Sequence, residues 1–328
     1  MNFSEYMKNS TKNIVISKVC SLLEKNPSKN MDKLFNLSIN LIKDNENKKK
    51  IKNAYTYYND TPLVKSFVEN ILLNINPNFL KKFTINFFNY VFDNKNHSYF
   101  PFFVMNLSPK DKCNEITYSD VDTILNKVKE NKIYYVFIIG KEPFSIDFLY
   151  NIYKKYSDIV FIPLTNGELL TPIICNRLYS SCNVIPIISL DGFQEDTDYE
   201  RGIGTFDKIM SNMDLLKQNS IPFGISSNIS LDNIDIITSN EFIDMLLNRG
   251  AFINLYFYDS IINEKKQKLE LYAKLKNLRI NKSCFPLDFL DNSINSKILI
   301  DKNGLYNNEL KLKFNNIKYC FNSCSLRI

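Results

Sequence analysis

Residues 183–228 read NVIPIISLDGFQEDTDYERGIGTFDKIMSNMDLLKQNSIPFGISSN, and the order of apolar runs within them indicates the fold class. An apolar run at 184–190 predicts a buried strand, a helical apolar period follows at 204–219, and a second apolar run at 223–229 predicts another strand. Two strands joined by a connector of this length favour parallel pairing with a right-handed crossover. The stretch is therefore one unit of an α/β fold.

The same alternation extends to both sides of this stretch. Further strands are predicted at 102–107, 134–139, 159–164 and 252–258. Helical stretches are predicted between them at 118–131, 145–157, 168–180, 238–249 and 262–279. Six β/α units of this kind fit either a doubly wound sheet or a partial (βα) barrel.

The flanking regions differ in character from this α/β region. All eight glycines lie at or after Gly140, and the residues before 99 have helical apolar spacing. We therefore expect about five helices in an N-terminal region over 1–98, ending near Asp93. The α/β region then covers 99–280, and a C-terminal extension with a hairpin around Asn303-Gly304 covers 281–328.

Composition excludes several classes of function. His97 is the single histidine of the 328 residues, so histidine-based metal centres and histidine-dependent triads are not expected. A net charge of +6 is mild, and the basic run Lys48–Lys52 is interpreted as a solvated helix face, so nucleic acid is not an expected partner. The chain has no apolar run long enough for a bilayer and no secretory signal, which predicts a cytoplasmic protein without membrane contact.

Polar residues and glycines gather directly after the predicted strands. They form the stretches 108–113, 140–143, 165–167, 189–192, 226–228 and 256–259. The carboxyl ends of parallel strands meet at one edge, which is where α/β folds bind ligands. The acidic residues Asp191, Glu195, Asp196 and Asp198 lack the spacing of a calcium loop, so we interpret them as a solvated loop that caps the following helix.

Three of these stretches resemble the radical S-adenosylmethionine (radical SAM) superfamily, and within it the members with a SPASM-type C-terminal extension. They are GKEP at 140–143, TNG at 165–167 and SLDGFQEDTDYERGIGTFDKIM at 189–210. The resemblance covers roughly residues 101–260 and, more faintly, the C-terminal extension. It implies a (βα)6 partial TIM-type barrel, with SAM bound across the strand ends beside a [4Fe–4S] cluster.

The cluster motif of the family is broken in this chain. Three thiolates at CxxxCxxC spacing hold three irons of the cluster and leave the fourth iron to SAM. Cys113 stands where the first cysteine is expected, but the other two positions are Thr117 and Asp120. Cys320 and Cys324 have a CxxxC spacing, and we interpret them as a remnant of the extension rather than as replacement ligands. Neither a [4Fe–4S] cluster nor another resident cofactor is therefore expected.

The family's GGEP-like element is altered as well, because Lys141 replaces its second glycine. A lysine there places a positive charge where family members bind the SAM amino group, so SAM binding is expected to be weak. By resemblance, a vestigial SAM site consists of Glu142, Asn166, Ser189, Arg201 and Asn228, with Lys141 obstructing it. In this hypothesis Arg201 reaches a carboxylate or phosphate, and Glu142 takes an ammonium group.

The sequence thus predicts a radical-SAM-like pseudoenzyme without catalytic residues, and Cys113 as an unmetallated remnant. It would bind a peptide, a small molecule or a partner protein, for which an active paralogue is one candidate. Two alternatives stay open, namely an active radical SAM enzyme with an atypical cluster site and a cluster-free SAM-binding protein. Cys20, Cys175 and Cys182 are predicted to be buried, reduced thiols.

Overall fold

The protein is described from a computed structural model. The structure describes residues 17–18, 21–22, 27–41, 45–60, 65, 68–69, 74–93, 102–107, 116–230, 232–258, 270, 273–275, 277–278, 281–282, 285–288, 299–301, 304–307 and 310–312. The chain divides into two compact units, Met1–Ile85 and Asn86–Ile328. The predicted boundary at residue 98 stays a prediction.

The N-terminal unit is helical in its described residues. Helix α2 (Pro27–Leu41) packs against α3 (Asn45–Asp60) through Phe35, whose ring lies 4.5 Å from that of Tyr55 and 6.0 Å from that of Tyr58. Helix α5 (Pro77–Asp93) crosses into the second unit and ends at the predicted residue. The remaining segments of the predicted helical region lie largely outside the described residues.

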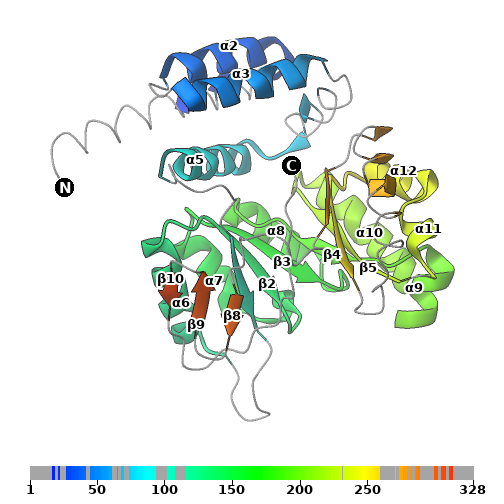
Figure 1. Ribbon diagram of the computed structural model, residues 1–328. Coiled ribbons are helices and arrows are strands. Elements are labelled where there is room, and N and C mark those ends of the chain that lie inside the picture. The colour runs from blue at the N-terminus through cyan, green and yellow to red at the C-terminus, as the bar shows by residue number, and fades with distance from the viewer. Residues whose placement is uncertain are drawn as a thin grey trace. The chain divides into compact units, whose positions relative to one another are not determined.

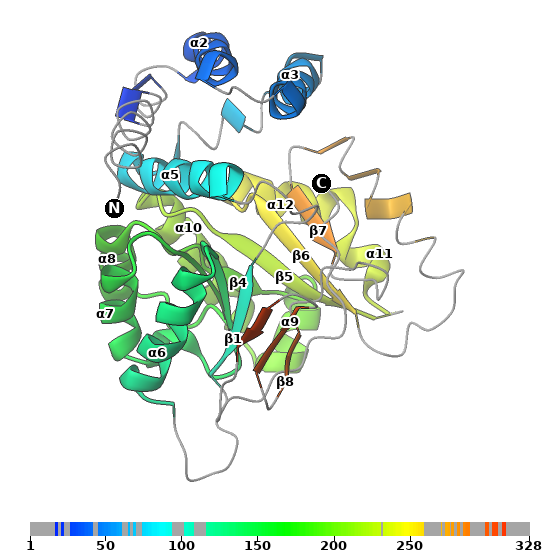
Figure 2. The same cartoon turned by 60° about the vertical axis from the view of Figure 1, so that its left-hand side comes forward.

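The second unit is built on a seven-stranded parallel sheet (Figure 1). Its strands follow the chain in the order β1 (Phe103–Asn106), β2 (Tyr135–Ile139), β3 (Val160–Thr165), β4 (Ile187–Ser189), β5 (Gly224–Ile229), β6 (Ile253–Tyr258) and β7 (Phe285–Asp288). A doubly wound sheet reverses its strand order at one point, and this sheet does not. The sequential order therefore excludes the doubly wound sheet and fits the partial barrel, the other predicted fold. The sheet curls into a half-barrel (Figure 2).

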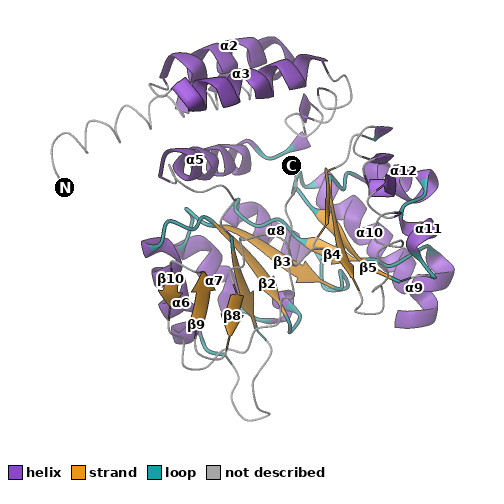
Figure 3. Ribbon diagram, in the orientation of Figure 1, coloured by secondary structure: helices purple, strands orange, loops and turns teal. Residues whose placement is uncertain are grey.

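Helices cover the convex face of this half-barrel (Figure 3). They are α6 (Tyr118–Glu130), α7 (Phe148–Lys155), α8 (Pro172–Ser181), α10 (Thr205–Gln218) and α12 (Asn240–Arg249), with shorter helices η1 (Pro143–Ser145), α9 (Gln194–Arg201) and α11 (Ile234–Ile237). The core between helices and sheet is apolar: Tyr153 of α7 is fully buried, and its ring lies 4.9 Å from that of Phe161 on β3. The predicted helix at 262–279 lies mostly outside the described residues.

The six predicted strands are confirmed, and a seventh was missed. Strand β7 lies in the predicted C-terminal extension, yet it pairs in parallel with β6, with Pro286 opposite Asn254. Proline removes a backbone donor, which is tolerated in an edge strand such as β7 because one side of that strand is unpaired in the sheet. Beyond it, β8 (Leu299–Asp301) and β9 (Gly304–Asn307) form the hairpin predicted around Asn303-Gly304, and β10 (Leu310–Leu312) pairs with β9.

The acidic segment after β4 is a helix, α9, where the sequence predicted a loop. Its first turn contains Glu195 and Asp196, and its last residue is Arg201. Negative charge at a helix N-terminus and positive charge at its C-terminus both stabilise the helix dipole. The predicted capping role is confirmed for Asp198, whose carboxylate accepts hydrogen bonds from the backbone N–H of Gly204 (3.1 Å) and of Phe206 (2.9 Å) at the start of α10.

These two backbone donors make the stability of the α9–α10 junction pH-dependent. They lower the pKa of Asp198 below its usual range, so its ionised form is favoured in the folded state. Its contribution is complete above the unfolded-state pKa of about 3.9 and is lost as the pH falls through the lower folded-state pKa. Asp198→Asn is therefore expected to lower the urea midpoint at pH 7, and the difference from wild type should shrink below about pH 4.

Urea titrations at pH 7 and near pH 3 measure this effect. The matched control is Asp232→Asn, at an exposed carboxylate for which no hydrogen bond is found among the described residues. A deficit for Asp198→Asn that is as large at pH 3 as at pH 7 would contradict the assignment.

No helix among the described residues has the length and apolar character of a membrane span.

Candidate functional site

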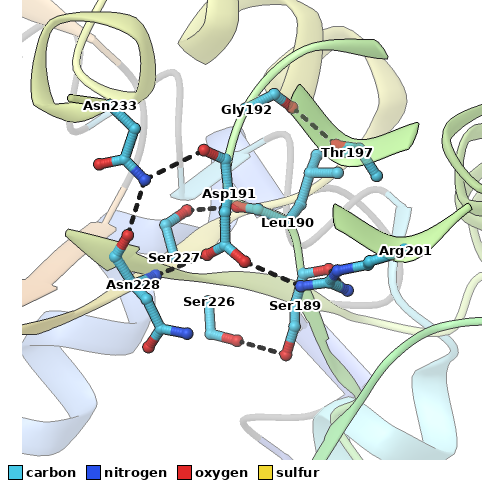
Figure 4. Close-up of polar contacts among 10 residues, drawn as sticks. All are labelled: Ser189, Leu190, Asp191, Gly192, Thr197, Arg201, Ser226, Ser227, Asn228 and Asn233. Atoms are coloured by element: carbon cyan, nitrogen blue, oxygen red, sulfur yellow. Dashed lines mark hydrogen bonds and ion pairs between the residues drawn. The ribbon is translucent and has the colours of Figure 1, made fainter. Parts of the chain in front are cut away.

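The predicted site residues lie at the carboxyl ends of β2 to β5, and the structure gathers them into two groups. One group surrounds Asp191, directly after β4, and is drawn in Figure 4. The other surrounds Glu142, after β2. The two groups lie on neighbouring strand ends, because β3 pairs with β4 through Thr165 and Ile188.

Asp191 is the centre of the first group. One carboxylate oxygen accepts from Arg201 Nη2 at 2.8 Å, and the other accepts from the backbone N–H of Asn228 at 2.7 Å. Arg201 also donates from Nη1 to the backbone carbonyl of Ser189 at 2.7 Å. The Arg201 and Asp191 side chains are only 20% and 13% exposed, so the pair is largely shielded from water.

Two further side chains fix the backbone around this pair. Asn233 donates to the carbonyl of Asp191 at 3.2 Å and to that of Asn228 at 2.8 Å. Ser227, on β5, donates to the carbonyl of Leu190 at 2.6 Å (Figure 4). The ends of β4 and β5 are therefore joined by side-chain hydrogen bonds beyond the strand ladder.

Uncharged polar side chains lie on the other side of this junction. Ser189 and Ser226 are register partners, and their hydroxyl oxygens lie 3.2 Å apart. Asn228 follows Ser226 by two residues, so its side chain emerges on the same face of the sheet, and it is exposed. Three predicted residues, Ser189, Arg201 and Asn228, thus meet, and the two that line the face are neutral.

Glu142 forms the second group. Its Oε1 accepts from Thr165 Oγ1 at 2.8 Å and from the Phe144 backbone N–H at 3.2 Å, while Oε2 accepts from the Asn166 N–H at 3.1 Å. The Asn166 side chain is exposed and donates to Glu168 at 2.9 Å. Glu142 therefore links the turn after β2 to the turn after β3.

The other predicted site residues are less connected or are not described. Lys141 is exposed beside Glu142 at the end of β2. Cys113, Cys320 and Cys324 lie outside the described residues, as do Cys20 and His97. Cys175 and Cys182 are buried free thiols as predicted, and burial raises the pKa of Cys175 to about 11. Among the described residues, no three His, Cys, Asp or Glu side chains are grouped so that they could hold a metal ion.

The sequence placed Asp191 in the acidic run without recognising its role. Its partner Arg201 is ten residues away, at the end of α9, and Asn228 is on another strand. The one signal in the sequence is its position in SLDGF, immediately after a buried strand. Thr165 was missed for a similar reason, because its contact with Glu142 spans 23 residues.

The charged residues of the site are paired within the chain. The two charged residues assigned to an amino-acid-like ligand, Glu142 and Arg201, are both engaged by groups of this chain. At these strand ends the Asn228 amide and Lys141 are exposed, the Ser189 hydroxyl is half-buried and the Ser226 hydroxyl is buried. The neutral groups can donate and accept hydrogen bonds.

Comparison with known proteins gives one sequence relative and several structural neighbours. No family model matches the chain. The AdoMet-dependent heme synthase of Methanosarcina barkeri is 27% identical over 128 residues, which is 38% of this chain and 37% of that protein. The chain therefore matches little more than a third of the length of this curated relative.

Solved structures with a similar fold include Streptococcus suis SuiB bound to S-adenosylmethionine. That structure is 16% identical, with a TM-score of 0.49, and the match covers 66% of this chain and 58% of SuiB. Another is anSMEcpe with bound AdoMet and the Cp18Cys peptide, which is 14% identical with a TM-score of 0.44 and coverage of 58% and 63%.

The resemblance rests on the SLDGF and TNG strand ends, the sequential half-barrel and the sequence match to the heme synthase. On these grounds the resemblance to the radical SAM superfamily is confirmed for the barrel of this chain. The resemblance to members with a SPASM-type extension stays a prediction.

Proposed function

We propose that this chain has kept the radical SAM barrel without its iron–sulfur chemistry and acts by binding. The observation that carries the proposal is the use of Thr117 and Asp120, the positions at which CxxxCxxC, counted from Cys113, requires the second and third thiolates. Thr117 is instead the N-cap residue of helix α6, and Asp120 lies in the first turn of that helix.

The two residues form a reciprocal cap. The Thr117 hydroxyl oxygen accepts from the Asp120 backbone N–H at 3.3 Å, and the Asp120 carboxylate accepts from the Thr117 N–H at 2.9 Å. A capping box of this kind satisfies backbone donors that a helix N-terminus leaves free. The hydroxyl and carboxylate are thus occupied, and neither supplies the sulfur that a [4Fe–4S] iron takes as ligand. The residues present do not fit the cluster.

The strand ends also argue against tight SAM binding. SAM ends in an ammonium and a carboxylate group, and family members hold both beside the cluster. Here the Glu142 carboxylate already accepts three hydrogen bonds, and two nitrogens of Arg201 donate to Asp191 and Ser189. A ligand would have to share these charged groups with their internal partners, which makes weak binding the expected outcome.

Wild-type protein is therefore expected to bind SAM no more tightly than about 1 mM, which corresponds to about 4 kcal/mol. If Lys141 obstructs the ammonium position, Lys141→Gly should bind SAM more tightly than wild type does, because the variant removes both the charge and the bulk. Isothermal titration calorimetry measures both affinities.

Lys132→Gly is the matched control, because Lys132 is an exposed lysine before β2, at the opposite edge of the sheet, with a φ of 57° that glycine accepts. Micromolar binding by wild type would overturn the proposal. A gain shared by Lys132→Gly would show that Lys141 is not the obstruction.

Three classes of ligand fit this proposed binding function. A peptide, a small molecule or a partner protein, such as an active paralogue, is compatible with an edge of hydroxyl and amide groups. A cytoplasmic location is part of this proposal.

A further inference from the structure

Two large apolar side chains project into water at the end of α9. Tyr199 is 92% exposed and Ile203 is 99% exposed, although both belong to residue types that are normally half-buried or buried. Together with Glu200 beside them and Glu195 in the first turn of α9, they make up what we call the α9 tip. Scattered exposed apolar residues are ordinary. Tyr199 and Ile203 differ from them in their hydrogen-bonded backbone and in their acidic surroundings.

Ile203 is held in place by its neighbours. It sits between Gly202 and Gly204, whose φ angles of 103° and 86° lie in the region that favours glycine. The Asp198 carboxylate binds the N–H of Gly204, and the Thr205 N–H donates to the Gly202 carbonyl at 3.2 Å. An exposed apolar side chain on a hydrogen-bonded loop loses little conformational entropy on binding, which is what interface anchors require.

The surroundings of these anchors are acidic. Residues 191–201 contain five acidic residues and one basic residue. Asp191, Asp196 and Asp198 accept hydrogen bonds within the chain, whereas Glu195 and Glu200 are exposed and have no ion pair among the described residues. A partner for the α9 tip must therefore present lysine or arginine around an apolar contact.

The N-terminal unit of this chain has the charge that such a partner needs. Residues 1–85 contain 14 lysines, no arginine and seven acidic residues, a net charge of +7. The rest of the chain has 27 basic and 28 acidic residues, so the excess positive charge lies entirely in the N-terminal unit. On α3, Lys49 and Lys52 are exposed one helical turn apart and have no ion pair among the described residues.

We propose that the α9 tip binds the basic N-terminal unit of a second copy of this chain. Tyr199 and Ile203 supply the apolar contact area, while Glu195 and Glu200 pair with lysines such as Lys49 and Lys52. A twofold dimer would form this contact twice, once in each direction. The inference does not depend on the proposed function, since it uses neither the cluster positions nor the strand-end residues.

Sedimentation velocity of the full chain tests the proposal, over a hundredfold range of protein concentration and at about 50 mM and about 500 mM salt. We expect a monomer–dimer equilibrium that weakens at the higher salt concentration, because exposed charges are screened over about 10 Å at 0.1 M. Glu195→Lys/Glu200→Lys should raise the dimer dissociation constant at least tenfold, and so should Tyr199→Ser/Ile203→Ser. Circular dichroism checks that each variant is folded.

Charge reversal on both sides makes the test specific. Lys49→Glu/Lys52→Glu alone should weaken the dimer, and combining it with Glu195→Lys/Glu200→Lys should restore much of the loss. Glu130→Lys/Glu241→Lys changes the net charge equally at exposed positions elsewhere on the barrel and should leave the dimer unchanged. A monomer at every concentration would overturn the proposal, and so would a dimer that the tip variants do not weaken. A salt-dependent change in sedimentation that does not depend on protein concentration would also overturn it, because the contact would then lie within one chain.

Discussion

Replacing Asn183 by alanine is expected to lower the free energy of unfolding by about 3 kcal/mol. The Asn183 side chain is completely buried between α7 and β4. The two N–H groups of its amide are shared among the backbone carbonyls of Tyr153 (2.9 Å), Tyr156 (3.1 Å) and Ile159 (2.9 Å). These carbonyls belong to the last turn of α7 and to the link into β3, where a helix leaves acceptors unpaired.

Removing that amide leaves buried acceptors without a donor, and each unsatisfied group costs about 1–3 kcal/mol. The Asn183 backbone also binds β3, since its carbonyl accepts from the Phe161 N–H at 2.8 Å, so the effect should spread to the adjoining strands. Urea unfolding followed by circular dichroism gives the free energy. Asn176→Ala, at an exposed position of α8, should stay within about 0.5 kcal/mol of wild type. A loss below 1 kcal/mol for Asn183→Ala would show that the three bonds are not what holds α7 to the sheet.

The second large effect is expected at Asp191. Asp191→Ala removes the acceptor of both Arg201 and the Asn228 N–H. Among the described residues, the Ser189 carbonyl is then the one acceptor left to a largely buried guanidinium. Breaking a buried ion pair from one side is more costly than removing both partners, because an uncompensated charge stays behind. We expect a loss of about 2–3 kcal/mol for Asp191→Ala.

A double-mutant cycle with Arg201→Ala separates the pair from its surroundings. The double variant should be more stable than the sum of the single losses predicts, with a coupling energy of about 1–2 kcal/mol. Losses that add within about 0.3 kcal/mol would mean that the ion pair makes no contribution of its own. A coupled result would explain why Arg201 is not available to a ligand at the strand ends.

The barrel was predictable from sequence because its signal is local. Each predicted strand is a short apolar run, and every one is found within three residues of its observed bounds, for example 134–139 against Tyr135–Ile139. The sequence did not distinguish the barrel from a doubly wound sheet, because strand order depends on contacts between strands that lie far apart in the sequence. The sequential order β1 to β7 settled it.

Two elements were missed because what stabilises them is not apolar periodicity. Helix α9 reads QEDTDYER, with no apolar face to detect, and is stabilised by charges at its ends and by the Asp196 contact with the Phe193 N–H. Strand β7 is four residues long and contains Pro286, which weakens any strand pattern.

The sequence predicted where the residues of the candidate site lie, but not which of them form hydrogen bonds with one another. Ser189, Arg201 and Asn228 do converge, yet Arg201 binds Asp191 and Ser189 rather than facing outward. Glu142 and Asn166 also meet, with Thr165 as an unforeseen third partner. A motif places residues at strand ends, whereas their pairing depends on side chains that lie far apart in sequence.

Anaerobic reconstitution determines whether the barrel holds an iron–sulfur cluster. Wild type and Cys113→Ala are reconstituted anaerobically with iron and sulfide, desalted, and analysed for iron and acid-labile sulfide. Because Thr117 and Asp120 cap α6 where the family has thiolates, we expect a colourless protein with iron far below one per chain in both samples. About four irons per chain in wild type, lost in Cys113→Ala, would contradict the account.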